Sequence, residues 1–259
     1  MSGVGLVFIR IARWYSVLVA LIAWELMAHS GLVHRGLMPD LISIGAAVLH
    51  GIANGDLAYH SAVTVGRALF GFATGAIAGI MLGALMARSG RFEELFEPIF
   101  SFGYPVPKIA FYPLFVFVLG VGTVSKLTLV FLECVYPVAV NTYLGVKAAE
   151  RIHVWAALSM GASRWHIFWR VLVPTAAPYV FSSLRTAAHV SLIVVIILEM
   201  IGDSVGLGYY VAFKSAAFDF ADSFAGTAAV IFWGLVFDRL IIWARNRIVF
   251  WEPETPRIG

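Results

Sequence analysis

The 259-residue sequence has few charged residues and a single cysteine, and both shortages limit what the protein can be. Only 13% of the residues are charged and 61% are hydrophobic, which is not the composition of a soluble globular chain. Cys134 lies within an apolar run, which excludes a disulfide framework or a thiolate metal site within one chain. The net charge is only +3, and the arginines gather at the ends of apolar runs rather than along a nucleic-acid-binding stripe.

The motifs of ATP hydrolysis and of metal binding are also missing from the sequence. A phosphate-binding P-loop requires Gly-Lys-Ser/Thr, and the four lysines follow Pro107, Ser125, Val146 and Phe213. We therefore expect any ATP-driven work to come from a partner. The seven histidines are scattered, and His29 and His34 are merely near one another, so we expect no metal site. The sequence contains no internal repeat and no low-complexity segment.

Apolar runs dominate the sequence instead, and several approach or exceed the roughly 20 residues that a helix needs to cross a bilayer. We expect six spans. The first combines residues 4–11 with 14–27, whose charged start and small residues near 28–30 also fit a cleavable signal peptide, although an uncleaved anchor is the plainer interpretation. The others are residues 61–87, a span from Phe92 interrupted by Pro105, Pro107 and Pro113, residues 124–146, a span from Pro174 or Pro178 to Gly202, and residues 224–243.

The positions of the arginines predict the orientation of these spans. They cluster before the first span, after the second and fourth, and after the sixth, which is one and the same side of the membrane for six helices. Cytoplasmic N- and C-termini follow from the positive-inside rule. Arg35, Lys126 and Lys214 fall on the other side as exceptions.

Small features of the outer connectors and of the second span predict local structure. Residues 40–50 can form a short amphipathic helix at the outer interface, and residues 203–222 form a semi-polar outer segment. Gly71, Gly75, Gly79 and Gly83 recur every four residues, so they lie on one side of the second span. Small residues at this spacing let another helix come close, and we favour packing within the chain over a subunit contact.

A polar island, residues 147–174, interrupts the apolar runs. It contains Lys147, Arg151, Arg164 and Arg170 together with Glu150, His153 and His166. Apolar or small residues with i, i+3, i+4, i+7 spacing give a basic cytoplasmic helix one apolar face, and they are Val154, Ala157, Leu158 and Gly161. Such a helix is suited to being bound by a partner protein, although Gly161 can also mark a break between two short helices.

Four ionisable residues fall within the predicted spans, where each costs about 2.5–3.5 kcal/mol on insertion scales and usually faces a cavity or a partner. They are Lys108, Glu133, Arg185 and Glu199. Lys108 and Glu133 lie at similar depth, so they either form a structural pair or line a path for an anion. Arg185 and Glu199 fall on nearly one helix face with His189, although Glu199 could instead be exposed at the interface beside Gly202.

The island carries a resemblance to the permease subunits of bacterial ATP-driven (ABC) importers. Their cytoplasmic loop has the pattern Glu-Ala-Ala, three residues, Gly, nine residues and Ile-x-Leu-Pro. Ala156, Ala157, Gly161 and the run Val171 to Pro174 match this pattern, whereas Trp155 replaces the glutamate. The surrounding GASRWHIFWRVLVPTAAPYVFSSLR, PVPKIAFYPLFVFVLGVGTVSK and GLGYYV resemble the nitrate/sulfonate/taurine branch.

The resemblance implies an all-α membrane protein with the type I importer permease fold, about six transmembrane helices and a cytoplasmic coupling helix. Residues 1–56 would form the N-terminal helix and outer connector, 57–250 the permease core and 251–259 a cytoplasmic tail. The implied ATPase-coupling residues are Trp155, Ala156, Ala157, Gly161, Ser163, Arg164 and Pro174.

The resemblance also implies partners and a mechanism. Two copies of this chain would sit in the bacterial inner membrane with two ATPase subunits, which bind ATP and Mg²⁺, and an external substrate-binding protein. Alternating access would carry nitrate, taurine or a sulfonate, or alternatively riboflavin or a pyrimidine vitamin precursor. An ion-driven secondary transporter is the rival from another class, but no inverted repeat is visible. A membrane-embedded enzyme would need clustered histidines or acids, which the sequence does not show.

Overall fold

The computed structural model describes residues 15–33, 36–103, 105–149 and 151–251, and this part of the chain contains helices and no strand. The predicted all-α fold is confirmed. Four helical runs are long and apolar enough to cross a membrane, and a bent pair of shorter segments can add a fifth. The four are α4 (Asp56–Arg88), α7 (Thr123–Lys147), the run Arg164–Gly202 and α12 (Phe220–Ile248). The first expected span corresponds to α2 (Tyr15–His29), while its residues 4–11 lie outside the described part.

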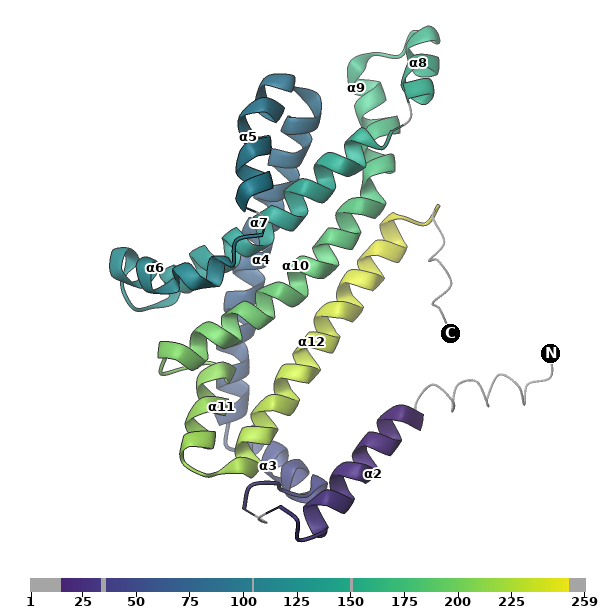
Figure 1. The fold of residues 1–259 in the computed structure, drawn as a ribbon. Coiled ribbons are helices and arrows are strands. Elements are labelled where there is room, and N and C mark those ends of the chain that lie inside the picture. Colours follow the sequence, from purple (N-terminus) through teal and green to yellow (C-terminus); the bar gives the residue numbers. More distant parts are fainter. Residues whose placement is uncertain (1–14, 34–35, 104, 150, 252–259) are drawn as a thin grey trace, which may run out of the picture.

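The centre of the protein is formed by α4, α7 and α10 (Val173–Gly202), which cross one another along most of their lengths (Figure 1). Several of the core side chains are short. Val130, Cys134 and Val138 of α7 and Ala187 of α10 are fully buried. In lipid, helices associate through close packing rather than through the hydrophobic effect, so small buried residues favour this arrangement.

The glycine stripe of α4 packs against α7, as the spacing predicted. A Cβ atom on Gly75 would lie 2.7 Å from the Cβ of Cys134, and one on Gly79 would lie 2.8 Å from the Cβ of Val138. Real Cβ atoms do not approach so closely, so the two backbones can meet only because the side chains are absent. Packing within the chain is therefore the role of this stripe.

The third expected span is not one kinked helix but two helical segments. α5 (Gly90–Gly103) ends before the prolines, and the 3-10 turn η1 (Lys108–Phe111) leads into α6 (Tyr112–Leu119). The two segments are bent by 87°. Pro105 and Pro107 remove two backbone donors and push Val106 between them towards an extended conformation, which ends the helix instead of kinking it.

The fifth span begins earlier than the prolines suggested. The run starts at α9 (Arg164–Ile167), continues through the π-helical turn η2 (Phe168–Leu172) and becomes α10. Pro174 lacks an N–H group, so the carbonyl four residues before it has no ordinary helical partner. The wider turn directly before Pro174 accommodates this defect and keeps the helix continuous.

Short helices lie at the end of the molecule where α4 begins. Asp40 caps α3 (Leu41–Ala53) by accepting a 2.8 Å hydrogen bond from Ser43 N, which confirms the predicted short helix. The semi-polar segment contains α11 (Leu207–Ala216), and α12 begins at Phe220, before the expected start. α2 joins this end through its last turns, where the ring of Trp24 lies 5.1 Å from that of Phe224. Its other end leans away from α12 (Figure 1).

Candidate functional site

The polar island folds into a helical hairpin at the opposite end of the molecule, beyond the ends of α4 and α7 (Figure 1). Its first helix is α8 (Arg151–Ser159), and α9 follows after a short turn. Gly161 lies in this turn with φ +79°, so the prediction that it sits on the apolar face of a continuous helix is wrong. Ala162 N donates to Ala157 O at 3.0 Å and Gly161 N to Leu158 O at 2.9 Å, which is the bond pattern of a Schellman motif.

The turn explains the residues around Gly161. A left-handed conformation favours glycine, and a Cβ at this position would meet no atom within 4 Å, so the backbone angle and not crowding selects glycine. Ser163 starts the next helix by accepting a 3.2 Å hydrogen bond from His166 N on its hydroxyl. The chain thereby reverses within a few residues and presents α8 as a separate short helix.

Large apolar side chains of α8 point away from the protein. Ile152 is 66% exposed, Trp155 64% and Met160, just after the helix, 80%. Ala157 is buried beneath them. The other predicted coupling residues Ala156, Ser163 and Arg164 are exposed, and Pro174 is half-buried. An exposed apolar surface on a basic hairpin is typical of a docking site.

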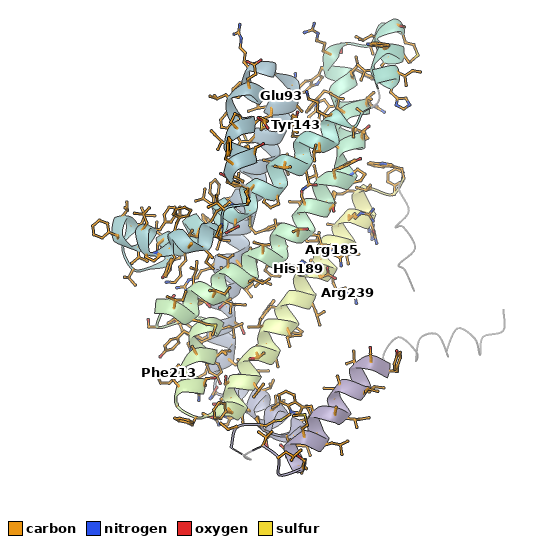
Figure 2. The ribbon with its side chains drawn as sticks, in the orientation of Figure 1. Glu93, Tyr143, Arg185, His189, Phe213 and Arg239 are labelled. Atoms are coloured by element: carbon orange, nitrogen blue, oxygen red, sulfur yellow. The ribbon has the colours of Figure 1, made fainter. Side chains whose placement is uncertain are left out.

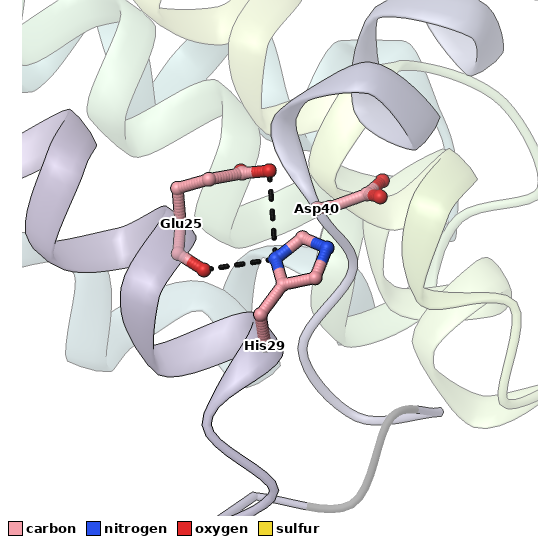
Figure 3. Close-up of side chains that lie close together, drawn as sticks. All are labelled: Glu25, His29 and Asp40. Carbon is pink, nitrogen blue, oxygen red and sulfur yellow. Dashed lines mark hydrogen bonds and ion pairs between the residues drawn. The ribbon is translucent and has the colours of Figure 1, made fainter.

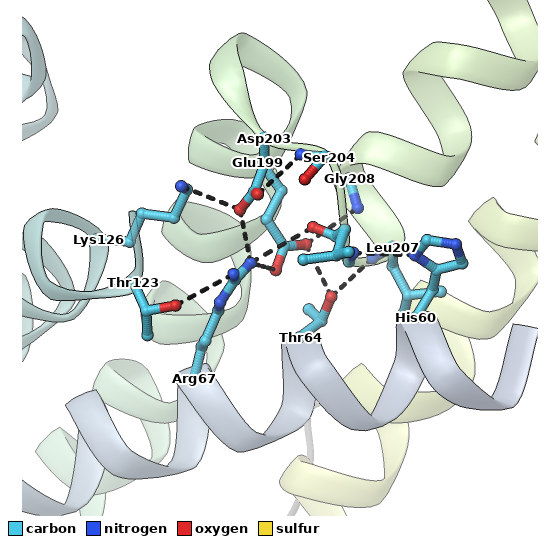
Figure 4. Close-up of polar contacts among 12 residues, drawn as sticks. His60, Thr64, Arg67, Thr123, Lys126, Glu199, Asp203, Ser204, Leu207 and Gly208 are labelled. Carbon is cyan, nitrogen blue, oxygen red and sulfur yellow. Dashed lines mark hydrogen bonds and ion pairs between the residues drawn. The ribbon is translucent and has the colours of Figure 1, made fainter. Parts of the chain in front are cut away.

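A second polar site lies in the interior, near the end of the molecule that holds α11. Arg67 of α4, Lys126 of α7, Glu199 of α10 and Asp203 just after α10 form a closed cluster of two cations and two anions (Figure 4). Arg67 NH1 lies 2.8 Å from Glu199 Oε1 and 2.7 Å from Asp203 Oδ2, and Lys126 Nζ lies 2.9 Å from the same Asp203 oxygen. Glu199 and Lys126 have no exposed surface.

This closed cluster corrects two expectations from the sequence. Glu199 is not exposed at the interface, and Lys126 is not an outer loop charge but is buried. Burial alone would raise the pKa of Asp203. The hydrogen bonds from Lys126 and Ser204 N and the charge of Arg67 outweigh it, so the pKa lies below its ordinary value.

Glu199 also holds the start of α11. Thr64 donates to Glu199 Oε2 at 2.7 Å and accepts from Leu207 N at 2.7 Å, while Gly208 N donates to the same carboxylate oxygen at 3.1 Å. A carboxylate at a helix N-terminus satisfies backbone donors and complements the helix dipole. Gly206, with φ +109°, lies against the Glu199 carboxyl group, where a Cβ would overlap it. The GLG sequence is therefore required for this close approach.

Lys108 and Glu133 are brought together, as their similar depth predicted. Lys108 Nζ lies 3.8 Å from Glu133 Oε2 and 4.2 Å from the centre of the Tyr136 ring. Both side chains are mostly buried, at 11% and 19% exposure. This geometry supports a structural pair between η1 and α7, and a role in solute passage stays a prediction.

Arg185 and Glu199 do not act as one group, because each has its own partner on a different helix. Arg185 Nε donates to Asp238 Oδ1 of α12 at 2.6 Å, and His189 Nε2 lies 3.6 Å from the same oxygen. The side chains of Arg185 and His189 are 50% and 41% exposed, in contrast to the buried Glu199. Figure 2 shows both residues on α10 beside α12.

Sequence reasoning overlooked Arg67, Asp203 and Asp238. Arg67 and Asp238 lie inside apolar runs, so the rule that singled out Arg185 and Glu199 applies to them as well. Their pairing could not be read from the sequence, because Arg67 and Glu199 are separated by 132 residues and Arg185 and Asp238 by 53.

Among the residues that the structure describes, one group of side chains could hold a metal ion. Glu25, His29 and Asp40 offer ligand atoms within 4.8 Å of one another at the junction of α2 and α3 (Figure 3). An acid four residues before a histidine is a signal that the sequence analysis passed over. Two of the three also have structural roles: Glu25 Oε2 accepts from Leu41 N, and Asp40 caps α3. The hydrogen bonds from Ser43 lower the pKa of Asp40.

A family model described as "Binding-protein-dependent transport system inner membrane component" matches residues 75–249, which is more than half of the chain. The chain is 32% identical over 161 residues to the taurine transport system permease protein TauC of Escherichia coli (strain K12), an alignment that covers 62% of this chain and 58% of that relative. It is 26% identical to the putative aliphatic sulfonates transport permease protein SsuC of Bacillus subtilis (strain 168), over 92% of this chain and 85% of the relative.

The name of a third relative gives a different substrate. The formylaminopyrimidine transport permease protein ThiX of Halalkalibacterium halodurans is 29% identical over 80% of this chain and 82% of its own length. Among solved structures, an amino acid ABC transporter matches with a TM-score of 0.61 at 16% identity, over 80% of this chain and 97% of that chain. The MetNI methionine ABC transporter matches with a TM-score of 0.57 at 16% identity, over 72% and 91%. These structures share the fold.

Proposed function

The chain belongs to the family of binding-protein-dependent transport system inner membrane components, and we propose that it forms the passage through which an ATP-driven importer moves a small organic or inorganic anion. The proposed solutes are nitrate, taurine and alkane- or arylsulfonates. Two permease copies, two ATPase subunits and an external binding protein would form the complete importer. ATP and Mg²⁺ would bind to the ATPase subunits.

The exposed apolar surface of α8 is the observation that carries this proposal. Trp155 is 64% exposed on a short helix that the Gly161 turn separates from α9. A large aromatic side chain on a protruding surface is the kind of anchor that fills a pocket on a partner. Closure of the ATPase subunits would push on α8 and, through α9 and η2, on α10. The solute would then be exposed to alternate sides of the membrane.

The distribution of charge supports the orientation that this mechanism requires. Arg88, Arg91, Lys147 and Arg164 all lie at the hairpin end of the molecule, and Arg245 and Arg247 end α12 towards the same side. The positive-inside rule places this end in the cytoplasm, where the ATPase subunits would dock.

The test is ATP-driven uptake by proteoliposomes that contain this chain, its ATPase and its binding protein. We expect labelled taurine, ethanesulfonate or nitrate to accumulate only when ATP is enclosed with the ATPase side of the complex. Uptake that follows an ion gradient without ATP would indicate a secondary transporter instead. ATP-driven uptake of a pyrimidine or of riboflavin, and of none of the three anions, would favour the alternative that the ThiX likeness raises.

A further inference from the structure

Four ionisable residues within the predicted spans were candidates for the passage, and the structure separates one of them from the other three. Lys108 and Glu133 pair with each other while mostly buried, and Glu199 is enclosed with Arg67 and Thr64. Arg185 differs because half of its side-chain surface is exposed although it lies far from the ends of α10. His189, one turn further along, is exposed on the same side.

Both partners of this open pair lie well within the membrane-spanning helices. At about 1.5 Å per residue, Arg185 is about 18 Å from the start of α10 at Val173 and about 26 Å from its end at Gly202. Asp238 is about 27 Å from the start of α12 at Phe220 and about 15 Å from its end at Ile248. A guanidinium group within a membrane-spanning helix is costly in hydrocarbon and almost always faces the bundle interior or a water-filled cavity. Asp238 also holds it towards α12, so it does not extend along the helix to the headgroups.

The hydrogen bonds leave the binding atoms of Arg185 available. Only its Nε donates to Asp238, at 2.6 Å, and no side chain or carbonyl in the described part of the chain accepts from its two terminal amino groups. His189 Nδ1 lies 2.7 Å from Arg185 O. Since a carbonyl can only accept, Nδ1 carries the proton of this bond and the other ring nitrogen, Nε2, faces the open side near Asp238.

We propose that Arg185 forms the contact site for the charged head of the transported solute, an oxoanion of the sulfonate or nitrate type; this inference rests on the proposed import of an anion. The two terminal amino groups of Arg185 have no acceptor in the described part of the chain, whereas the cations and anions of the Arg67 cluster are paired and buried. Two parallel N–H groups of a guanidinium match two oxygens of such a head. Asp238 is the positioning residue that fixes the direction of the fork.

The experiment replaces Arg185 and Asp238 together, because a single substitution would leave the other charge without its partner. The Arg185→Gln/Asp238→Asn variant keeps polar side chains of similar size. A matched control is Glu93→Gln/Lys147→Gln, which removes another ion pair between two helices. Lys147 Nζ lies 2.8 Å from Glu93 Oε2, and the side chains of this pair are exposed to a similar extent as those of Arg185 and Asp238. Glu93 lies at the hairpin end with Tyr143, away from Arg185 (Figure 2).

Uptake of labelled taurine, ethanesulfonate and nitrate is measured in proteoliposomes with the complete importer, together with the solute concentration that gives half-maximal uptake. Loss of a charge-assisted contact should reduce uptake of the transported anion roughly 10-fold to 100-fold in the Arg185 variant. Arg185→Lys, which keeps the charge but loses the fork, should raise the half-maximal concentration, and the control should match the wild type. Co-purification of the ATPase subunit verifies that each variant is folded and assembled.

The two proposals fail in different ways. If the wild type takes up none of the three anions with ATP, the proposed anion import is overturned, and this contact site with it. If the wild type transports one of them and the assembled Arg185→Gln/Asp238→Asn variant transports it equally well, only the contact site is overturned. A variant that loses uptake together with its ATPase subunit would show a structural pair and would also overturn the contact site.

Discussion

Arg67 joins three segments of the chain with one side chain. Its NH1 group binds Glu199 of α10 and Asp203 after it, and its NH2 group donates to Thr123 at the start of α7 at 3.2 Å. Every atom of the buried Glu199 carboxylate that can accept a hydrogen bond has a partner from Thr64, Arg67 or Gly208. The cluster therefore fixes how one end of α4, α7, α10 and α11 meet, and replacing one charged member leaves a net charge at this buried site.

We expect Glu199→Gln to destabilise the protein strongly, because Arg67 would keep its charge while losing an anion at 2.8 Å. Breaking a buried ion pair in this way costs on the order of 3 kcal/mol. Thermal unfolding in detergent is the measurement. The control is Glu93→Gln, whose ion pair with Lys147 is partly exposed and whose loss should change the melting temperature little. Equal melting temperatures for the two variants would contradict the structural role of the cluster.

The glycines of α4 allow a second comparison at single residues. Gly75→Ala should destabilise the protein by about 1–3 kcal/mol, because the new methyl group would lie 2.7 Å from Cys134 Cβ and 2.8 Å from Phe131 O. Gly66 lies on the same helix with no atom within 4 Å of a Cβ, so Gly66→Ala should be neutral or stabilise by up to about 1 kcal/mol. Melting temperatures measured side by side decide the matter, and a tolerated Gly75→Ala would show that α4 and α7 can separate without cost.

At the level of helices, periodicity in the sequence was sufficient where a helix is uninterrupted. It predicted α3, α4, α7 and α12 to within a few residues, because apolar runs and Gly or Asp boundaries act locally. It failed at three places where a backbone angle or a proline decides the path. Gly161 adopts a left-handed angle, Pro105 and Pro107 separate α5 from α6, and η2 carries the helix through Pro174.

The sequence predicted several of the charged residues that lie within the spans but not all of their pairings. A charge inside an apolar run is visible in the sequence, so Lys108, Glu133, Arg185 and Glu199 were identified as candidates. Which of them are buried with a partner and which is exposed depends on contacts that tertiary packing makes, and the partners of Arg185 and Glu199 are more than 50 residues away in the sequence. Only the structure therefore shows that Arg185 is half-exposed while Lys108, Glu133 and Glu199 are mostly buried with their partners.

α8 gives a prediction at the level of one helix. Trp155→Ala should weaken association with the ATPase subunit by about 30-fold or more, as expected for loss of an aromatic anchor, and Trp155→Phe should weaken it less. Trp243 is a matched control, since it is similarly exposed at 63% but lies on α12. Trp243→Ala should leave the association unchanged. Co-purification and equilibrium binding of the ATPase are the measurements, and undiminished binding by Trp155→Ala would remove α8 as the docking helix.

For the molecule as a whole, the two ends differ in charge and in form. One end carries the basic α8–α9 hairpin, and the other carries α3, α11 and the start of α12, where Lys214 pairs with Asp219 and Asp222. These two acids neutralise the exceptional lysine and raise its pKa, so Lys214 adds no net positive charge to its side of the membrane. Lys126 is neutralised in the same way by Asp203. Two of the three exceptions to the positive-inside pattern are therefore explained by local pairing.

This asymmetry predicts which end is cytoplasmic, and cysteine labelling of intact cells can test it. Cys134 is fully buried, so the unmodified protein should give no background with a membrane-impermeant maleimide. Single cysteines at the exposed Asp56 and Asp219 should react from outside, because both lie at the end opposite the hairpin. Ser163→Cys, exposed in the hairpin, should react only after the cells are opened. Reaction of Ser163→Cys in intact cells would reverse the orientation, and ATPase subunits in the cytoplasm could then not reach α8.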